Sequence, residues 1–241
     1  MNSAESEQSL VLIKPDALKN SLTGYVLSQL SEYHSGLIFA GAKIVNVSKL
    51  LAEEHYAEHK GKGFFPSLID YITGVLHFPS DPGKRRVKAY VYQGTDAIKK
   101  IREICGPTNP LDAREKKPGC IRSLGTLVPI KDETGKQIGD RMDNLIHASA
   151  NASDAEREIK LWFRPADIPA SMRMFPTEIC EEFIYVKNDK PTTTYEKGSV
   201  CIFAPGDIAW KSDIDALRAH LKGTATEITV GTVVAKYVLH M

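Results

Sequence analysis

The sequence predicts an α+β fold, in which an antiparallel sheet with helices on one face is followed by a β-rich C-terminal extension. Three observations support this prediction. Short apolar segments of strand length alternate with segments of helical periodicity in the order β-α-β-(α-α)-β-α-β-α up to about residue 186. Gly and Pro residues mark the boundaries between these segments. Beyond that point the chain is rich in β-branched and aromatic residues. The order of elements is typical of a split βαβ, ferredoxin-like sheet.

The first elements form a β-α-β unit. An apolar run over 9–15 predicts a buried strand, and the helical spacing of apolar residues over 21–36 predicts a helix. The segment 37–48 predicts the second strand. Ser48 at the end of this strand is expected to cap a helix over 49–60, because a serine oxygen can accept a hydrogen bond from the first free N–H groups.

The middle of the chain continues this alternation. A short helix is predicted over 65–74, and alternating β-branched and aromatic residues predict a strand over 86–94. Thr95 is expected to cap a helix over 96–106. The segment 107–119, rich in Pro, Gly and charged residues, is predicted to be a loop.

A further helix follows a polar stretch. The segment 131–140 is predicted to form a hairpin-like turn after an apolar segment at 120–130. Ser153 and Glu156 have the spacing of a capping box before a helix over 155–163.

Two segments look like insertions into this plan, one near 77–86 and one near 124–141. The main domain is therefore expected to span 1–186. The remainder, 187–241, is expected to be an extension with strands at 199–206 and 226–240 and a helix between them.

Composition excludes several classes of protein. Apolar residues make up 42% of the chain and charged residues 25%, as in ordinary globular domains. The formal net charge of +1 creates no global field for nucleic acid, which is not expected as a partner. No apolar run is long enough to span a bilayer, so no membrane association is expected. The four cysteines form no C-x-x-C pair, which favours reduced thiols and a cytoplasmic location.

One short motif raises the possibility of a metal site. His55 and His59 with Glu58 between them form an H-x-x-E-H pattern on a predicted helix, as in one class of zinc peptidases. The alternative is that both histidines simply lie on a polar helix face. A zinc hydrolase would also need a third ligand and an open coordination position.

Phosphate binding would depend on side chains, because the sequence contains no G-x-x-x-x-G-K-[ST] loop and no well-placed G-x-G-x-x-G. Lys14, Arg102 and Arg122 each lie beside a Gly or Pro turn. The planar guanidinium of arginine suits two phosphoryl oxygens at once. Each cation taken alone could equally be a solvated surface charge.

Five separated motifs in a fixed order give a more specific indication. KPDALKN, EEHYAEHKGKGFFPSLIDYITG, GPTNP, KPGCIR, and NLIHAS followed by AEREIKLWF resemble the nucleoside diphosphate kinase family over roughly residues 8–186. The resemblance implies a ferredoxin-like fold that moves the γ-phosphate of a nucleoside triphosphate to a nucleoside diphosphate by a ping-pong route through a phosphohistidine. It also implies a homo-oligomer.

The resemblance assigns roles to individual residues. His147 would be the nucleophile, oriented by Glu158 and its hydroxyl partner Ser149, with Lys14 also catalytic. Phe64 would stack on the base, whereas Phe65 is expected in the core. The other residues expected to line the phosphate and sugar site, together with Lys14, are Tyr56, Arg102, Thr108, Arg122 and Asn144.

The chemistry of these residue types fits the implied reaction. An ordinary imidazole is mostly uncharged at neutral pH and can attack phosphorus, while a carboxylate on its other nitrogen fixes the tautomer. Phosphoryl transfer depends mainly on positioning and positive charge. Mg²⁺ is expected as the cofactor, held mainly through phosphate oxygens, so no protein metal ligands are predicted.

The sequence departs from the family at the site. Where the family has H-G-S-D, this chain has His147 to Ala150, so an acidic group is missing. Asp143 replaces a basic residue, and 21 residues separate Arg122 from Asn144, more than in the family. The alternative function is therefore a nucleotide-binding regulatory module with weak or no kinase activity.

Two basic clusters leave another possibility open. They could contact RNA or acidic lipid, steer nucleotides towards the site, or simply be solvated loop charges. Their members are Lys84, Arg85, Arg86 and Lys88 in one, and Arg114, Lys116 and Lys117 in the other.

Overall fold

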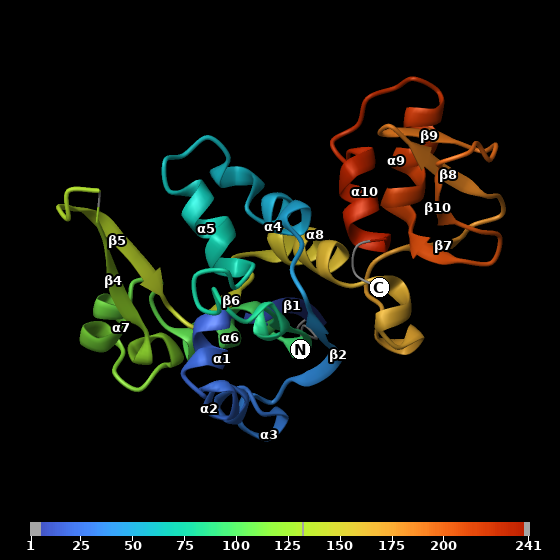
Figure 1. Ribbon diagram of the computed structural model, residues 1–241. Coiled ribbons are helices and arrows are strands. Elements are labelled where there is room, and N and C mark those ends of the chain that lie inside the picture. The colour runs from blue at the N-terminus through green and yellow to red at the C-terminus, as the bar shows by residue number, and fades with distance from the viewer. Residues whose placement is uncertain (1–5, 132, 239–241) are drawn as a thin grey trace.

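The computed structural model describes residues 6–131 and 133–238. Figure 1 shows a sheet surrounded by helices, a hairpin that projects from one side, and a smaller C-terminal lobe on the other side. The hydrophobic core of the lobe is continuous with that of the sheet, because Trp162 and Phe163 belong to the same buried cluster as Trp210 and Phe203.

The main sheet has the order β2-β3-β1-β6, with every neighbouring pair antiparallel. Strands β1 and β2 are therefore parallel to each other with β3 between them, which is the split βαβ arrangement that the sequence predicts. The strands span Ser6–Ile13 (β1), Ile38–Val45 (β2), Val87–Thr95 (β3) and Ile146–Ala148 (β6).

Both faces of the sheet are buried. Successive side chains of a strand point to opposite faces, and both sets of side chains of β1 lie in a core. Val11 and Ile13 of β1 belong to one core cluster, and Leu10 and Leu12 belong to the other. The helices of the split βαβ motif lie on the first face, as predicted: α1 (Pro15–Lys19), α2 (Thr23–Gln29), α3 (Glu32–Ser35) and α6 (Ala97–Cys105). Further helices cover the second face, so helices flank both sides of the sheet and not one face alone as predicted: α4 (Lys49–His55), α5 (Phe65–Ile72) and α8 (Ala152–Trp162).

Two predictions of secondary structure are wrong in detail. The helix predicted over 21–36 is divided, because Ser31 starts a new helix by accepting a hydrogen bond from the His34 backbone. The loop predicted over 107–119 contains helix α7 (Pro110–Lys116), in which Asn109 provides the cap and Pro110 occupies the first turn. Short-range capping outweighed the Pro-rich composition there.

Two predicted caps are also corrected, whereas Ser48 caps α4 as predicted. Thr95 is the last residue of β3, and Glu7 instead accepts the hydrogen bond from the Ile98 backbone. Helix α8 starts at Ala152, because Asn151 rather than Ser153 accepts a hydrogen bond from the Asp154 backbone, at 2.9 Å.

The two predicted insertions differ in structure. Residues 77–86 form an irregular segment with a 3₁₀ turn at Pro82–Lys84. The second insertion contains the predicted hairpin, formed by β4 (Thr126–Lys131) and β5 (Gln137–Asp143). Other 3₁₀ turns lie at Ala57–His59, Ile121–Leu124, Pro165–Asp167 and Ala170–Met172.

The C-terminal lobe contains short strands and two helices. A β10-β8-β9 sheet and a β11-β7 pair lie beside the helices. The strands are β7 (Thr177–Ile179), β8 (Ile184–Lys187), β9 (Lys190–Thr192), β10 (Val200–Phe203) and β11 (Ile208–Trp210), and the helices are α9 (Lys211–Leu221) and α10 (Val230–Tyr237). The predicted boundary at 187 stays a prediction, and β7 starts ten residues before it.

The prediction of a strand at 226–240 is wrong, because residues 230–237 form helix α10. Residues 239–241 lie outside the described part. Thr229 caps this helix by accepting from the Thr232 backbone at 3.1 Å. Val230, Val233 and Tyr237 lie on one helical face and are buried in the shared core. Packing against the domain therefore overrode the strand propensity of the β-branched residues.

Candidate active site

A cavity of about 470 Å³ lies between helices α4 and α5, the hairpin β4-β5 and strand β6. Its lining includes all the side chains predicted for the site except Ser149: Lys14, Tyr56, Phe64, Arg102, Thr108, Arg122, Asn144, His147 and Glu158. Ser149 lies behind this surface. The fold thus gathers residues that are more than 130 positions apart in the sequence.

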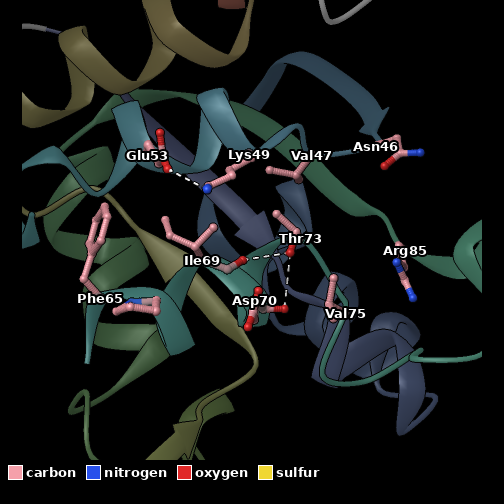
Figure 2. A pocket seen from close by; sticks show the side chains of 11 residues that line it. Asn46, Val47, Lys49, Glu53, Phe65, Ile69, Asp70, Thr73, Val75 and Arg85 are labelled. Carbon is pink, nitrogen blue, oxygen red and sulfur yellow. Dashed lines mark hydrogen bonds and ion pairs between the residues drawn. The ribbon is translucent and has the colours of Figure 1, made fainter. Parts of the chain in front are cut away.

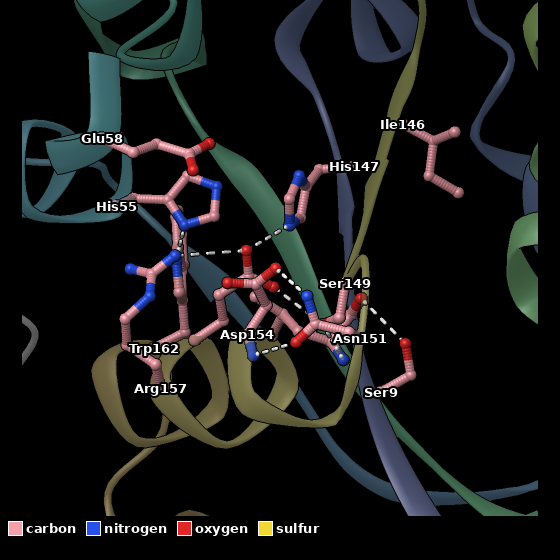
Figure 3. A network of polar contacts seen from close by, with 12 residues as sticks. Ser9, His55, Glu58, Ile146, His147, Ser149, Asn151, Asp154, Arg157 and Trp162 are labelled. Carbon is pink, nitrogen blue, oxygen red and sulfur yellow. Dashed lines mark hydrogen bonds and ion pairs between the residues drawn. The ribbon is translucent and has the colours of Figure 1, made fainter. Parts of the chain in front are cut away.

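His147 is held at the cavity by strand β6, where it pairs with Leu12 of β1. Its Nε2 lies 2.9 Å from Glu158 Oε1, and Ser149 donates a hydrogen bond to Glu158 Oε2 at 2.7 Å. Ser149 Oγ in turn accepts from the Leu10 backbone at 3.0 Å. Figure 3 shows the imidazole of His147 above this network. Because Nε2 is engaged by Glu158, Nδ1 is the ring nitrogen available for chemistry.

Glu158 is charged in this setting. Burial alone would raise the pKa of its carboxyl group, but His147 beside it, together with the hydrogen bonds from His147 and Ser149, outweighs burial and holds the pKa at about 2. Arg157 contributes a further cation, with Nη2 3.6 Å from Glu158 Oε1. The carboxylate can therefore keep the proton of His147 on Nε2.

A second histidine supports the first. His55 is only 3% exposed, and its ring centre lies 4.6 Å from that of His147 in an edge-to-face arrangement (Figure 3). Its Nδ1 accepts a hydrogen bond from Trp162 Nε1 at 3.2 Å. Burial, and then the neighbouring His147, lower the pKa of His55 well below its ordinary value. His55 is therefore an uncharged packing neighbour of His147.

Lys14 is a buried cation at the end of β1. Its Nζ donates to Asn144 Oδ1 and lies 4.5 Å from the ring centre of Tyr71. Burial lowers the pKa of Lys14 to about 8, an effect that Asp16 opposes and Arg122 reinforces. The backbone around it is fixed, because Asp16 Oδ2 accepts from the Leu145 backbone at 2.8 Å. Lys14 thus carries a charge that is easily lost above neutral pH.

Two arginines flank the same end of the cavity. Arg122 is buried and donates to the main-chain oxygens of Gly106 at 2.9 Å and Ile146 at 3.2 Å, whereas its Nε has no hydrogen-bond partner among the described residues. Arg102 is exposed on α6. Thr108 accepts from Asn144 Nδ2 through its main-chain oxygen, at 2.8 Å. These groups form a positively charged end next to His147.

Aromatic side chains line the same cavity. Phe64 is 52% exposed and lines the cavity, and its stacking on a base stays a prediction, whereas Phe65 packs against the core, as predicted. The ring of His59 stacks on Tyr56 with 6.1 Å between ring centres and approaches Phe64 at 5.6 Å. Burial raises the pKa of Tyr56, so its phenol stays protonated. These rings offer flat surfaces suited to a ring-shaped group.

Sequence reasoning missed several residues of the cavity. His55 and His59 were considered as zinc ligands or as residues of a polar helix face, and the packing of His55 beside His147 had no signal in the sequence. Tyr71 and Arg157 lie inside two of the family motifs, but no role was assigned to them. The hairpin adds four more lining residues: Ile130, Asp140, Arg141 and Met142.

The structure does not support the zinc pair. Within residues 6–131 and 133–238, one group of three possible ligands is close enough for a metal, formed by His55, His147 and Glu158. His59 is not part of it, since its Nδ1 lies 3.0 Å from Lys62 Nζ. The H-x-x-E-H pattern therefore does not bring its two histidines to one metal site.

A second cavity of about 480 Å³ is equally large but lacks comparable chemistry. It lies beside α4 and α5, where Lys49 Nζ is 3.6 Å from Glu53 and Thr73 donates to the Ile69 main chain at 2.8 Å (Figure 2). Lys49 is thus paired with Glu53, and the Thr73 hydroxyl is used by the main chain of its own helix. The cavity at His147 is the candidate active site because its cations and imidazole converge.

The basic clusters are partly used inside the protein. Arg85 Nε donates to the Phe78 main chain at 2.8 Å, and Lys84 pairs with Asp81 at 2.8 Å. In the other cluster Arg114 donates to the Ser123 main chain at 2.9 Å, and Lys116 pairs with Asp112 at 3.0 Å. No helix in the described part of the chain is long and apolar enough to cross a membrane.

Comparisons with known proteins agree with this geometry. The family model described as nucleoside diphosphate kinase matches residues 7–168. The nucleoside diphosphate kinase of Pyrococcus furiosus is 41% identical over 164 residues, which cover 68% of this chain and 87% of that protein. The enzyme of Symbiobacterium thermophilum is 41% identical over 157 residues, which cover 65% of this chain and 87% of that protein.

Solved structures are similar as well. The Aquifex aeolicus nucleoside diphosphate kinase matches with a TM-score of 0.54 and 28% identity, covering 68% of this chain and all of that one. The Halobacterium salinarum enzyme in complex with CDP matches with a TM-score of 0.51 and 32% identity, covering 68% of this chain and 92% of that one. The Borrelia burgdorferi nucleoside diphosphate kinase, as a transition-state mimic with bound vanadate and ADP, matches with a TM-score of 0.52 and 29% identity. The match covers 70% of this chain and 94% of that one.

Proposed function

Because the chain belongs to the nucleoside diphosphate kinase family, we propose that it transfers the γ-phosphate of a nucleoside triphosphate to a nucleoside diphosphate through a phosphohistidine at His147. The observation that carries the proposal is the contact of His147 Nε2 with Glu158 at 2.9 Å, which leaves Nδ1 as the attacking atom. The relatives bound to CDP and to ADP with vanadate support a nucleotide substrate.

In the first half-reaction the Nδ1 lone pair attacks the γ-phosphorus. An N–P bond forms, the bond between phosphorus and the β–γ bridging oxygen breaks, and that oxygen leaves on the nucleoside diphosphate with its electron pair. Glu158 holds the ring proton on Nε2 throughout and stabilises the positive charge that develops on the imidazole. Ser149 keeps the carboxylate in place from behind.

Charge on the transferred group is balanced by the cationic end of the cavity. Lys14, Arg102 and Arg122 line it, and a well-placed arginine can contribute on the order of 10³-fold to phosphoryl transfer. The nucleoside diphosphate then leaves, and another binds in the same place. Its terminal phosphate oxygen attacks the phosphohistidine, the N–P bond breaks, and the imidazole recovers its lone pair.

The residues of the cavity fit a Mg²⁺ ion that is bound mainly by the substrate. No cluster of carboxylates is found among the described residues of the cavity, but Glu58, Asp140 and Asp154 line it and would be the acidic side chains available to the water shell of such an ion. Mg²⁺ bound to the phosphates would neutralise part of their charge. Ala150 lines the cavity where the family has an acidic residue, which favours the alternative of a nucleotide-binding module with weak turnover.

A labelling experiment separates these functions. The protein is incubated with γ-labelled ATP and Mg²⁺, and the expected label is acid-labile, alkali-stable and removed by any nucleoside diphosphate. His147→Ala should abolish it, whereas His34→Ala, which changes an exposed histidine on α3, should leave it intact. Absence of label in the unaltered protein, with nucleotide still bound, would establish the regulatory module instead.

Assembly and location are part of the proposal. Strand β2 lies at one end of the main sheet, and Ile38 and Ile44 on it are 45% and 65% exposed, which supports a homo-oligomer. Sedimentation of the purified protein tests this. The free cysteines at 105, 120, 180 and 201 support a reducing, cytoplasmic location, which fractionation of the source cells would test.

A further inference from the structure

The hairpin β4-β5 forms one wall of the nucleotide cavity. It belongs to the long segment between Arg122 and Asn144, and it contributes Ile130, Arg141 and Met142 to the lining. Phe64, at the start of α5, lines the same cavity with half of its surface exposed. Arg141 and Phe64, the side chain expected to stack on the base, therefore line one cavity.

Arg141 is held in a fixed orientation on this wall. Its Nε donates to Asp143 Oδ1 at 2.7 Å, and its Nη2 donates to Asp143 Oδ2 at 3.1 Å. Such a two-pronged pair fixes the plane of the guanidinium group. The side chain of Arg141 remains 22% exposed.

Asp143, which holds Arg141, is itself buried and connects the hairpin to the 77–86 segment. His77, from the 77–86 segment, has Nε2 2.8 Å from Asp143 Oδ2, and both residues are nearly inaccessible. The ring of His77 also contacts Tyr71, with 5.2 Å between ring centres. A guanidinium group that faced only solvent would gain nothing from a buried carboxylate of this kind. The arrangement positions Arg141 at the cavity.

A fixed guanidinium plane is suited to a nucleobase. It can stack on the flat face of a base, as an aromatic ring does, and its N–H groups match the O6 and N7 acceptors of guanine. Purines offer the larger face and the N7 acceptor, whereas pyrimidines offer neither. Asp140 on the same wall adds a possible acceptor for an exocyclic amino group.

We propose that Arg141 contacts the base of the bound nucleotide together with Phe64 and gives purine nucleotides an advantage over pyrimidine nucleotides. The inference rests on the proposed function, since it concerns the acceptor site of the same reaction. A ring that stacks on Phe64 alone would be held with little regard to its identity. Arg141 therefore acts on nucleotide preference and not on the attack by His147.

The test compares Arg141→Met with the unaltered protein. Methionine keeps the unbranched chain and removes the charge and the N–H donors. With UTP as the phosphate donor, which yields a product different from every acceptor, KM and kcat are measured for ADP, GDP, CDP and dTDP, and the dissociation constants of ADP and CDP are measured by calorimetry. Arg86→Met is the matched control, because Arg86 is exposed and lies outside the cavity lining.

We expect Arg141→Met to raise KM for ADP and GDP about tenfold, to raise KM for CDP and dTDP less than about threefold, and to change kcat by less than about twofold. The control should behave as the unaltered protein. Equal losses for all four nucleotides would overturn the proposal, because they would place Arg141 on the sugar or phosphates. No change would overturn it as well.

Failure of the proposed function is distinguishable from failure of this inference. If the unaltered protein transfers phosphate to no acceptor, the calorimetric ratio of ADP to CDP affinity still tests Arg141. A second variant, Asp143→Asn, keeps Arg141 but weakens its anchor. It should reduce the purine advantage partially, and a purine advantage that is unchanged in both variants would sink the proposal.

Discussion

Thr232 Oγ1 lies 2.7 Å from Glu54 Oε2, so helix α10 of the C-terminal lobe is hydrogen-bonded to helix α4 one residue before His55. Arg157 on α8 donates to the main-chain oxygen of the same Glu54 at 3.5 Å. Helix α10 also packs against both α4 and α8, so the lobe supports the two helices that carry His55 and Glu158. The family match ends at residue 168, so this support comes from outside the matched segment.

Removing the hydroxyl group of Thr232 should weaken this connection. Thr232→Val keeps the shape of the side chain but leaves a carboxylate oxygen of Glu54 without its donor, so we expect the free energy of unfolding to fall by about 1–2 kcal/mol. Urea denaturation measures this change in the free energy of unfolding. Thr224→Val, at an exposed position, should change the free energy of unfolding by less than about 0.5 kcal/mol. Equal losses would show that the bond to Glu54 contributes nothing.

Replacing the carboxylate that faces His147 should slow phosphorylation of the protein. In Glu158→Gln the amide can donate to Nε2, which favours the tautomer with the proton on Nδ1, so we expect the single-turnover rate with ATP to fall about 100-fold or more. Rapid-quench labelling measures this rate. Glu156→Gln, on the same helix and paired with Lys160 at 2.5 Å, should change it less than about twofold. A rate that survives in Glu158→Gln would exclude tautomer control by this residue.

Alkaline pH should reduce nucleotide capture through Lys14. Burial lowers the pKa of Lys14 to about 8, so its cation is present below that pH and is lost above it. We expect kcat/KM, which reports the free enzyme, to decline above about pH 8. In Lys14→Arg the cation persists, and the decline should move to a higher pH. A decline at the same pH in Lys14→Arg would assign it to another group.

Acid should destabilise the fold through Glu158. Despite its burial, contacts with His147 and Ser149 hold the pKa of Glu158 at about 2, against 4.5 for an ordinary glutamate. A lowered pKa means that the stabilisation is complete above about pH 4.5 and is lost as the pH falls towards 2. Glu158→Gln should therefore flatten this part of the stability curve in urea titrations at a series of pH values. A curve as steep as that of the unaltered protein would assign the acid loss to other carboxyl groups.

The arrangement of the site was largely predictable because its residues lie in short motifs with fixed order. Lys14, Arg122 and His147 were expected together, and the structure brings them to one cavity. The packing of His55 against His147 was not predictable, since the sequence shows only that His55 lies near another histidine. A contact between residues 92 positions apart depends on how α4 lies over the sheet, which local patterns do not encode.

The fold was predictable to a similar degree and for a similar reason. The strands of the main sheet and the hairpin follow from periodicity, which is local. The last helix does not, because Val230 and Val233 have high strand propensity and become helical only against α4 and α8. Capping also escaped prediction where several polar residues compete, as at Asn151 and Ser153.

Gly106 tests how backbone geometry positions a cation of the site. Its φ is +79°, and an added Cβ would lie 2.9 Å from the Cys120 Cβ and closer still to the sulfur. Its main-chain oxygen accepts from Arg122 Nη1 at 2.9 Å. We expect Gly106→Ala to lower the free energy of unfolding by more than about 3 kcal/mol, or to prevent folding. Gly119→Ala, with a φ of +88° but open space around it, should lose only about 1–2 kcal/mol from backbone strain. Thermal unfolding of both variants measures the difference, and losses of equal size would mean that the clash with Cys120 is relieved without cost.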